Sequence, residues 1–192
     1  MGENWKRFRK DIFGVVRMIL NIGSGKSKEG DIRLDIYPLK NVNKVWNVEN
    51  GIPYPDNYFD KIICNCIFEH IKNPNNLLIE CYRVLKTNGK MNLLTDNAGY
   101  LLFHIMKRAI HGNYCDGYGY NEKKDRHYAL YTKEHLENHF EDVGFKVNKI
   151  EYKMMLGNKG WKKIKRFMVQ KIIKLIFNER VGYVRLDCEV SK

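Results

Sequence analysis

The sequence predicts an α/β fold in which helices cover both faces of a mainly parallel, doubly wound sheet. Short apolar runs bounded by turn residues alternate with segments of helical periodicity over most of the 192 residues. The first of these runs ends at the glycine turn Gly23-Ser24-Gly25, as a buried parallel strand does when it enters a tight turn. No repeat or linker divides the chain, so one domain is expected over residues 1–192.

The composition is that of a globular and strongly basic protein. Hydrophobic residues make up 44% of the chain, which excludes the intrinsically disordered class. The formal net charge of +12 favours an anionic partner such as nucleic acid, a lipid surface or an acidic metabolite. The five cysteines include no Cys-x-x-Cys pair, so reduced thiols in a cytoplasmic protein are expected. Arg17 and Asn21 interrupt the first apolar stretch, which argues against a signal peptide or a spanning helix.

The first half of the chain supplies a leading helix and four short strands. Residues 1–17 predict an amphipathic helix, because four large apolar residues recur at helical spacing between basic ones: Trp5, Phe8, Ile12 and Val15. The strands are expected at residues 18–22, 32–36, 42–47 and 61–66. Only residues 26–31 separate the first turn from the second strand, whereas a parallel crossover ordinarily takes a dozen or more residues. The first crossover helix must therefore be almost absent.

The second half alternates helices with strands. Asn73 provides an N-cap and Pro74 the first position of a helix whose buried stripe is Leu77, Leu78, Cys81 and Leu85. Thr132 caps a later helix, which stops at Gly144. The other elements are strands at residues 91–95, 145–152 and 183–190, a helix at 98–110, a Gly- and Tyr-rich loop at 112–131 and a basic helix at 161–177.

The glycine turn and Asp35 together indicate a nucleoside-binding site. Glycine lets the backbone approach a ligand closely, and Asp35 follows Gly23 by twelve residues at the end of the second strand. In doubly wound folds a carboxylate at this place accepts hydrogen bonds from both ribose hydroxyls. A phosphate-binding loop is excluded because it needs glycine at position 20, which is Leu20. A dinucleotide fingerprint is excluded because its third glycine would stand at position 28, which is Lys28.

These segments resemble, in order and near spacing, the methyltransferase type 11 family of class I S-adenosylmethionine-dependent methyltransferases. The resemblance covers residues 18–150 and is carried by residues 20–25, 34–36, 51–60, 68–71, 80–90, 131–136 and 143–145. It implies a Rossmann-like, seven-stranded sheet with an antiparallel last strand and S-adenosylmethionine as the cofactor. A shortened first crossover resembles a subgroup of this family. Because the cofactor has no phosphate, the missing helix N-terminus is no obstacle to binding.

The resemblance also assigns cofactor-binding residues. Gly23, Ser24 and Gly25 would flank the methionine moiety, and Asp35 would hold the ribose. The residues after the third and fourth strands would border the adenine: Asn47, Val48 and Asn65. Asn47 departs from the family pattern, which has an acid there, so an amide or the backbone would make this contact.

Three histidines are candidate bases. Methyl transfer is an in-line displacement, for which the protein mainly orients the reactants and excludes water. If the acceptor is a hydroxyl, a base within reach helps, and His70, His111 and His127 are nearest by order along the chain. The sequence favours a structural role for each of them, in a turn or a solvated loop. The loop at residues 112–131 is expected to be either a lid over the acceptor or disordered.

The segment at residues 159–180 carries eight Lys or Arg and one acid. One interpretation is an amphipathic helix that meets an anionic membrane or RNA through Lys162, Lys163, Lys165 and Arg166. The alternative, which the pattern favours, is a sheet-covering helix whose outer face is cationic.

The leading prediction is methyl transfer to a small-molecule or glycan-type acceptor, at oxygen, without a metal. An RNA methyltransferase is an alternative that the charge favours, although no Asn-Pro-Pro-Tyr-type motif is present. A second alternative is a non-catalytic protein of this fold that acts at RNA or an anionic membrane. Such a protein could have lost cofactor binding, but the sequence retains the predicted cofactor residues Gly23, Gly25 and Asp35, which argues against this loss.

Overall fold

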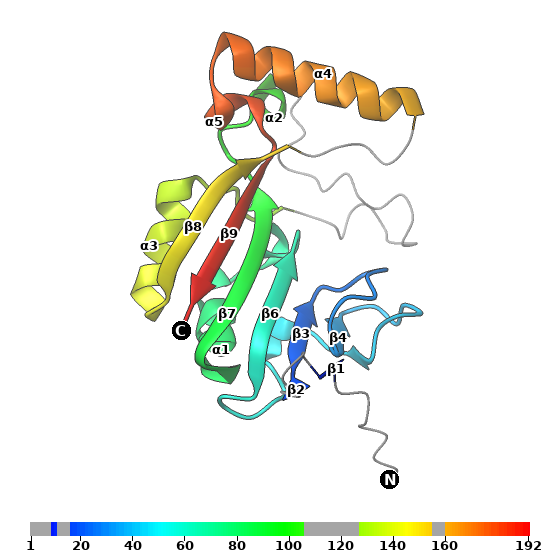
Figure 1. Ribbon diagram of the computed structural model, residues 1–192, viewed down its shortest axis with the longest axis vertical. Helices are drawn as coiled ribbons and strands as arrows, with labels where there is room; N and C mark the ends of the chain where they lie inside the picture. The colour runs from blue at the N-terminus through cyan, green and yellow to red at the C-terminus, as the bar shows by residue number, and fades with distance from the viewer. Residues whose placement is uncertain (1–8, 11–15, 106–126, 155–159) are drawn as a thin grey trace.

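A single seven-stranded sheet organises the molecule (Figure 1). The computed structural model describes residues 9–10, 16–105, 127–154 and 160–192. The strand order across the sheet is β5-β4-β3-β6-β7-β9-β8. In chain order the strands are β3 (Ile19–Ile22), β4 (Ile32–Asp35), β5 (Lys44–Val45), β6 (Phe59–Asn65), β7 (Leu85–Asp96), β8 (Lys146–Lys153) and β9 (Arg185–Ser191).

The directions of the strands confirm the predicted fold class. The five strands from β5 to β7 pair in parallel, and β9 lies antiparallel to both β7 and β8. The carboxyl ends of β3, β4, β6 and β7 therefore meet along one edge of the sheet, which we call the carboxyl edge. This is the edge where ligands bind in doubly wound folds.

The first crossover lacks a helix, as predicted. Between β3 and β4 the chain makes a compact turn in which the Ser27 N–H donates to the Ser24 carbonyl at 2.9 Å. The Asp31 N–H then donates to the Ile19 carbonyl at 2.9 Å, which returns the chain to the start of β3. Six residues suffice because the turn folds directly against the strand that it leaves.

Two helices and two short 3-10 segments surround the core. Helices α1 (Pro74–Val84) and α3 (Lys133–Val143) begin at Asn73 and Thr132, whose side chains accept backbone hydrogen bonds as N-caps. The 3-10 segments are η1 (Val48–Asn50) and η2 (Phe68–His70). The buried stripes of both helices join the strands in one hydrophobic core, with Leu78, Phe140 and Ile62 at most 1% exposed. These helix starts confirm the sequence prediction.

Some predicted boundaries are wrong. Residues Arg9–Lys10 (β1) and Val16–Arg17 (β2) form an antiparallel pair, so the described part of the leading segment is not helical. The β-branched Val16 favours extended backbone, and the pairing satisfies backbone groups that a helix would have used. The rest of residues 1–17 lies outside the described residues. Strand β7 starts at Leu85, which was predicted to belong to the preceding helix, six residues before the predicted strand start at residue 91.

The predicted helix at residues 98–110 is described only as α2 (Leu101–Ile105), and its remainder lies outside the described residues. Within the described parts of the chain, no helix combines the length and the apolarity needed to cross a membrane.

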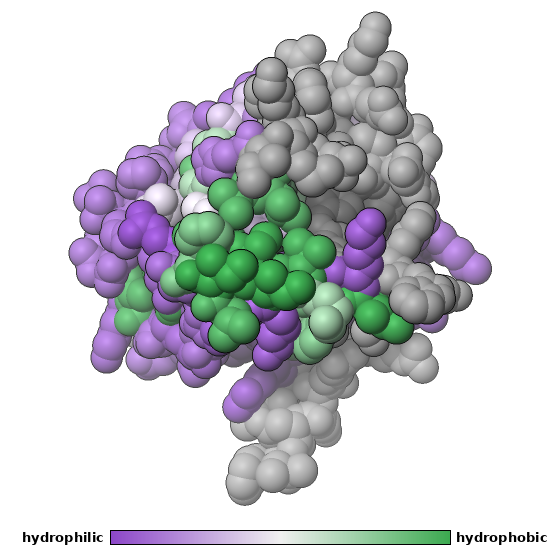
Figure 2. Space-filling model, turned by 90° about the horizontal axis from the view of Figure 1, so that it is seen from above, coloured by the Kyte–Doolittle hydropathy of each residue, from purple (hydrophilic) through white to green (hydrophobic). Residues whose placement is uncertain are grey.

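Helix α4 (Gly160–Ile176) does not cover the sheet, which corrects the interpretation favoured from the sequence. It lies beyond the carboxyl edge and packs against the short helix α5 (Glu179–Gly182) (Figure 1). The Asn97 side chain at the end of β7 donates to the carbonyls of Arg180 and Tyr183 at 2.7 and 2.6 Å. These bonds hold the connection between α4 and β9 at the carboxyl edge. Figure 2 looks onto this end and shows an apolar area bordered by hydrophilic residues.

Candidate functional site

The glycine turn after β3 is shaped by backbone constraints. Gly23 and Gly25 adopt φ angles of +63° and +52°, which residues with a side chain rarely adopt. A Cβ added to Gly23 would lie 2.7 Å from the Cδ1 atom of Ile67, which precedes η2. The turn is therefore packed tightly against the segment that follows β6, and only glycine fits at position 23.

Asp35 holds the turn to the end of β4. Its Oδ2 atom accepts the Gly25 N–H at 2.8 Å, and its Oδ1 atom accepts the Tyr37 N–H at 3.0 Å. The Ser24 N–H adds a bond to the Leu34 carbonyl at 3.0 Å. Each carboxylate oxygen has about two acceptor positions, so both keep room for a ribose hydroxyl. Asp35 thus has a structural role that the sequence did not predict, and the geometry is compatible with the predicted one.

The turn also contains a polar atom that suits a bound cofactor. Ser24 is 5% exposed, and its hydroxyl has no hydrogen-bond partner among the described residues. A buried polar group of this kind costs free energy unless something pairs with it. Together with the remaining acceptor capacity of Asp35, this hydroxyl fits the polar groups of S-adenosylmethionine, which when bound supplies an activated methyl group.

The remaining predicted cofactor residues lie along the same edge. Asn65 is the exposed last residue of β6. The Asn47 side chain accepts the Glu49 N–H at 3.0 Å and so caps η1. The side chain of Val48 packs in the hydrophobic core, so only its backbone is available to border a ligand. The structure therefore brings the predicted residues to one edge but gives two of them structural tasks.

A buried cluster of charges connects η2 with β7 and β9. Asp96 and Arg185 are paired across the antiparallel strands β7 and β9, and their side chains form an ion pair. Arg185 also donates to the Oε1 atom of Glu69 in η2 at 2.9 Å, and the Oε2 atom of Glu69 accepts the Thr95 hydroxyl at 2.8 Å. The side chains of all three charged residues are at most 2% exposed. We call Glu69, Asp96 and Arg185 the charge cluster.

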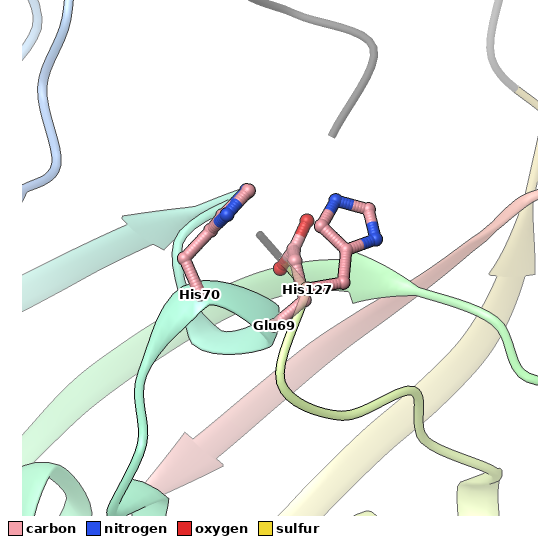
Figure 3. Close-up of side chains that lie close together, drawn as sticks. All are labelled: Glu69, His70 and His127. Atoms are coloured by element: carbon pink, nitrogen blue, oxygen red, sulfur yellow. The ribbon is translucent and has the colours of Figure 1, made fainter. Parts of the chain in front are cut away.

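Two of the three candidate histidines lie beside the charge cluster (Figure 3). The His127 Nδ1 atom is 3.4 Å from the Oδ2 atom of Asp96, and the His127 side chain is 3% exposed. The rings of His70 and His127 meet edge to face with their centroids 4.7 Å apart. The Tyr128 N–H donates to the Glu69 carbonyl at 2.8 Å, and this bond holds the backbone next to His127 against η2. His111 lies outside the described residues.

The charges at this place argue against cation binding. Glu69, His70 and His127 offer ligand atoms within 4.8 Å of one another, a spacing that a metal ion could use. Both Glu69 oxygens, however, are engaged by Arg185 and Thr95, and the guanidinium would repel a dication. A proton on His127, by contrast, would lie beside the negative charge of Asp96.

Neighbouring tyrosine and cysteine side chains are poor bases. Tyr131, predicted to belong to a lid, is 3% exposed and packs against Phe68 in the core. Burial raises the pKa of Tyr131 to about 12 and that of Cys66 to about 12, so both stay protonated at neutral pH. Tyr114, Tyr118 and Tyr120 of the predicted lid lie outside the described residues.

Sequence reasoning missed the charge cluster. The available signal was weak, because Arg185 alternates with apolar residues in the same way as Asp187 and Glu189, and Asp96 follows an apolar run. A buried charge needs an opposite partner, but the sequence does not show which one. Of the basic residues proposed for an anionic partner, Lys165 is exposed, and the side chains of Lys162, Lys163 and Arg166 are not described.

Comparison with known proteins agrees with this geometry. Residues 11–150 match the family described as "Methyltransferase domain". A curated relative from Escherichia coli O1:K1 / APEC, "Ubiquinone/menaquinone biosynthesis C-methyltransferase UbiE", is 24% identical over 182 residues, covering 73% of this chain and 72% of that protein. The protein of the same name from Vibrio cholerae O395 is 26% identical over 139 residues, covering 66% of this chain and 50% of that protein.

Solved structures share the fold. An S-adenosylmethionine-dependent methyltransferase from Archaeoglobus fulgidus superposes with a TM-score of 0.59 at 21% identity, covering 92% of this chain and 86% of that one. Another from Mesorhizobium loti gives a TM-score of 0.60 at 12% identity and covers 92% and 91% of the two chains. The family match covers most of the chain, and the fold agrees with it. The chain therefore belongs to the class I S-adenosylmethionine-dependent methyltransferases.

Proposed function

We propose that the protein methylates a small hydroxylated molecule bound at the carboxyl edge beside His70 and His127. The observation that carries this proposal is the position of His127, 3.4 Å from the buried carboxylate of Asp96. The glycine turn lies close by, because Gly23 contacts Ile67 and η2 begins at the next residue. A base and a methyl donor held at one edge are what methylation of a hydroxyl requires.

The residues divide the work between binding and proton transfer. Ser24 and Asp35 hold the cofactor, whose sulfonium supplies the methyl group. His127 accepts the proton of the acceptor hydroxyl, and Asp96 orients the imidazole and stabilises the imidazolium that forms. The deprotonated acceptor oxygen would then be the nucleophile for the activated methyl group that the bound cofactor would supply. Arg185 pairs with Asp96 and holds its carboxylate in place.

A second candidate is methylation at a ring carbon of a quinol-type acceptor. It is supported by the names of the curated relatives, which describe C-methylation in ubiquinone and menaquinone biosynthesis. The same base serves both reactions, because deprotonation of a ring hydroxyl makes its conjugated carbons nucleophilic. The acceptor atom therefore distinguishes the two candidates, whereas the role of His127 does not.

The test is a methyl-transfer assay with labelled cofactor and a panel of phenols, naphthoquinols and sugars, with mass spectrometry to locate the methyl group. His127→Asn should lower kcat by about 10²–10⁴, with cofactor affinity unchanged. The rise of kcat with pH that a histidine base produces should disappear in this variant. His135→Asn, at an exposed histidine of α3, is the matched control and should behave as wild type. A His127→Asn variant with wild-type kcat would reject the proposal.

A further inference from the structure

The outward side of α4 is apolar, which is unusual for a surface helix. At about 3.6 residues per turn, Ile164, Met168, Ile172 and Leu175 share one side of the helix. Ile173, which points to the opposite side, is 8% exposed and Gln170 is fully buried. On the outward side, Ile172 is 50% and Leu175 is 87% exposed. The helix therefore turns its weaker apolar side inward and its larger one outward.

Lysines accompany these apolar residues. Lys165 and Lys171 are exposed on the same half of the helix, and the Lys171 Nζ atom lies 5.6 Å from the centre of the Phe167 ring. The sequence of α4 contains no acid, and the following Glu179 is paired with Lys174. The outward side is thus both apolar and cationic.

We propose that α4 docks this protein onto the surface of an anionic lipid membrane. Helices that lie in the membrane interface combine exposed Ile, Leu and Phe side chains with flanking Lys or Arg. The apolar side chains enter the acyl boundary, and the lysines meet lipid phosphates. A contiguous exposed apolar area bordered by hydrophilic residues also marks an interaction surface on general grounds (Figure 2).

Two other occupants fit less well. RNA would pair with Lys165 and Lys171 and a base would stack on Phe167, but the more numerous exposed aliphatic side chains offer nothing to phosphates or to bases. A second copy of this chain, related by a two-fold axis, would bring cationic α4 surfaces together and so place like charges opposite one another. Only an anionic lipid surface matches the apolar side chains and the lysines together.

Docking through α4 would also orient the site. The helix lies beyond the carboxyl edge, the edge that carries the glycine turn and the charge cluster (Figure 1). The site would then face the lipid, where an apolar acceptor such as the quinol of the second candidate is concentrated. This last step rests on the proposed function, whereas the docking itself does not.

The test is sedimentation of the full chain with vesicles, without any acceptor, so failure of docking is distinguishable from failure of the proposed reaction. Binding to mixed phosphatidylcholine and phosphatidylglycerol vesicles should be about tenfold or more tighter than to pure phosphatidylcholine, and should weaken with salt. Lys165→Gln with Lys171→Gln should weaken binding to the anionic vesicles about tenfold. Lys146→Gln, at an exposed lysine of β8, is the control for charge.

A matched pair of isoleucines tests the apolar contribution. Ile172 in α4 and Ile79 in α1 are 50% and 51% exposed. Ile172→Glu should reduce vesicle binding at least as much as the lysine changes, whereas Ile79→Glu should leave it unchanged. Circular dichroism and cofactor affinity should remain those of wild type in both variants. The proposal is overturned if Ile172→Glu binds vesicles like wild type. It is also overturned if wild type does not bind vesicles, whether or not it binds RNA or self-associates through α4.

Discussion

The glycine turn and the charge cluster lie along the same edge of the sheet, yet they are held by different kinds of interaction. The turn depends on backbone geometry and on one carboxylate, with Gly25 and Asp35 only ten residues apart. The charge cluster depends on side-chain ion pairs, and Arg185 and Glu69 are 116 residues apart. One region is encoded by a short motif and the other by residues that only the finished sheet brings together.

This difference determines what each region tolerates. A turn that depends on backbone geometry is destabilised by an added Cβ but requires few particular side chains. Removal of either partner of a buried ion pair destabilises the protein, because the remaining charge is left in a medium of low polarity. We therefore expect substitutions in the charge cluster to affect folding most, and substitutions in the turn to affect cofactor binding as well as folding.

The largest expected effect is that of Arg185→Met. It leaves Glu69 and Asp96 buried without their shared cation, and should lower the free energy of unfolding by about 3–5 kcal/mol. Urea denaturation followed by circular dichroism measures it. Arg180→Met is the control, because Arg180 is 55% exposed and reaches Glu134 only at 3.9 Å. Arg180→Met should lower the free energy of unfolding by at most about 1 kcal/mol. Equal losses in the two variants would show that the charge cluster does not stabilise the sheet.

Local patterns in the sequence predict most of the fold. The N-caps Asn73 and Thr132 and the stop at Gly144 act within one turn of their own helices, so neighbouring residues suffice to place these boundaries. The missing first crossover helix follows from chain length alone. Strand β7 was placed too late because residues 85–90 gain backbone partners only in the assembled protein. The Asn88 N–H, for example, donates to the carbonyl of Lys192 at 3.1 Å.

Local sequence patterns could not predict the position of α4 or the charge cluster. Apolar residues at helical spacing look the same whether they face a sheet or an open surface, so periodicity gave the helix and not its packing. His70 and His127 were named as candidates by chain order, and the structure brings their rings together. Asp96 and Arg185 were missed because their pairing depends on the register of β7 against β9.

Gly23→Ala should have the next largest effect. The added methyl group requires an unfavourable φ and meets Ile67 at 2.7 Å, so a loss of about 2–4 kcal/mol in stability is expected, together with weaker cofactor binding. Gly144→Ala separates the two causes, since Gly144 also has a positive φ but a Cβ there would lie 3.5 Å from Tyr82. It should cost about 1–2 kcal/mol and leave cofactor binding intact. If adding Ile67→Ala does not partly rescue Gly23→Ala, the contact is not the cause.

Asp35→Ala should act on the cofactor more than on the fold. Loss of hydrogen bonds from a charged acceptor should weaken S-adenosylmethionine binding by about 1.5–3 kcal/mol, measured by calorimetry. Asp31→Ala is the matched control, because its carboxylate accepts the Ile19 N–H at 3.0 Å but lies before β4, away from the carboxyl edge. It should leave affinity unchanged. An unchanged affinity in Asp35→Ala would remove this residue from the cofactor site.

The smallest expected effect concerns a partly buried ion pair in α1. Glu80 and Arg83 of α1 are 23% and 31% exposed, and they hold the segment after η1. The Glu80 Oε2 atom accepts the Ile52 N–H at 2.7 Å, and Arg83 donates to the carbonyl of Ile52 at 2.9 Å. The hydrogen bonds from Arg83 lower the pKa of the Glu80 carboxyl below its usual range, against the opposing effect of burial.

A lowered folded-state pKa gives a definite pH dependence. The stabilisation by ionised Glu80 is fully present above the unfolded pKa, about 4.3, and is lost as the pH falls through the lower folded value. Glu80→Gln should therefore cost about 1–2 kcal/mol at pH 7, and this difference from wild type should shrink steadily below about pH 5. Urea denaturation at a series of pH values measures it. Glu137→Gln, at an exposed glutamate of α3, should stay within about 0.5 kcal/mol of wild type throughout. A cost for Glu80→Gln that does not change with pH would mean that side-chain shape, rather than charge, holds this segment.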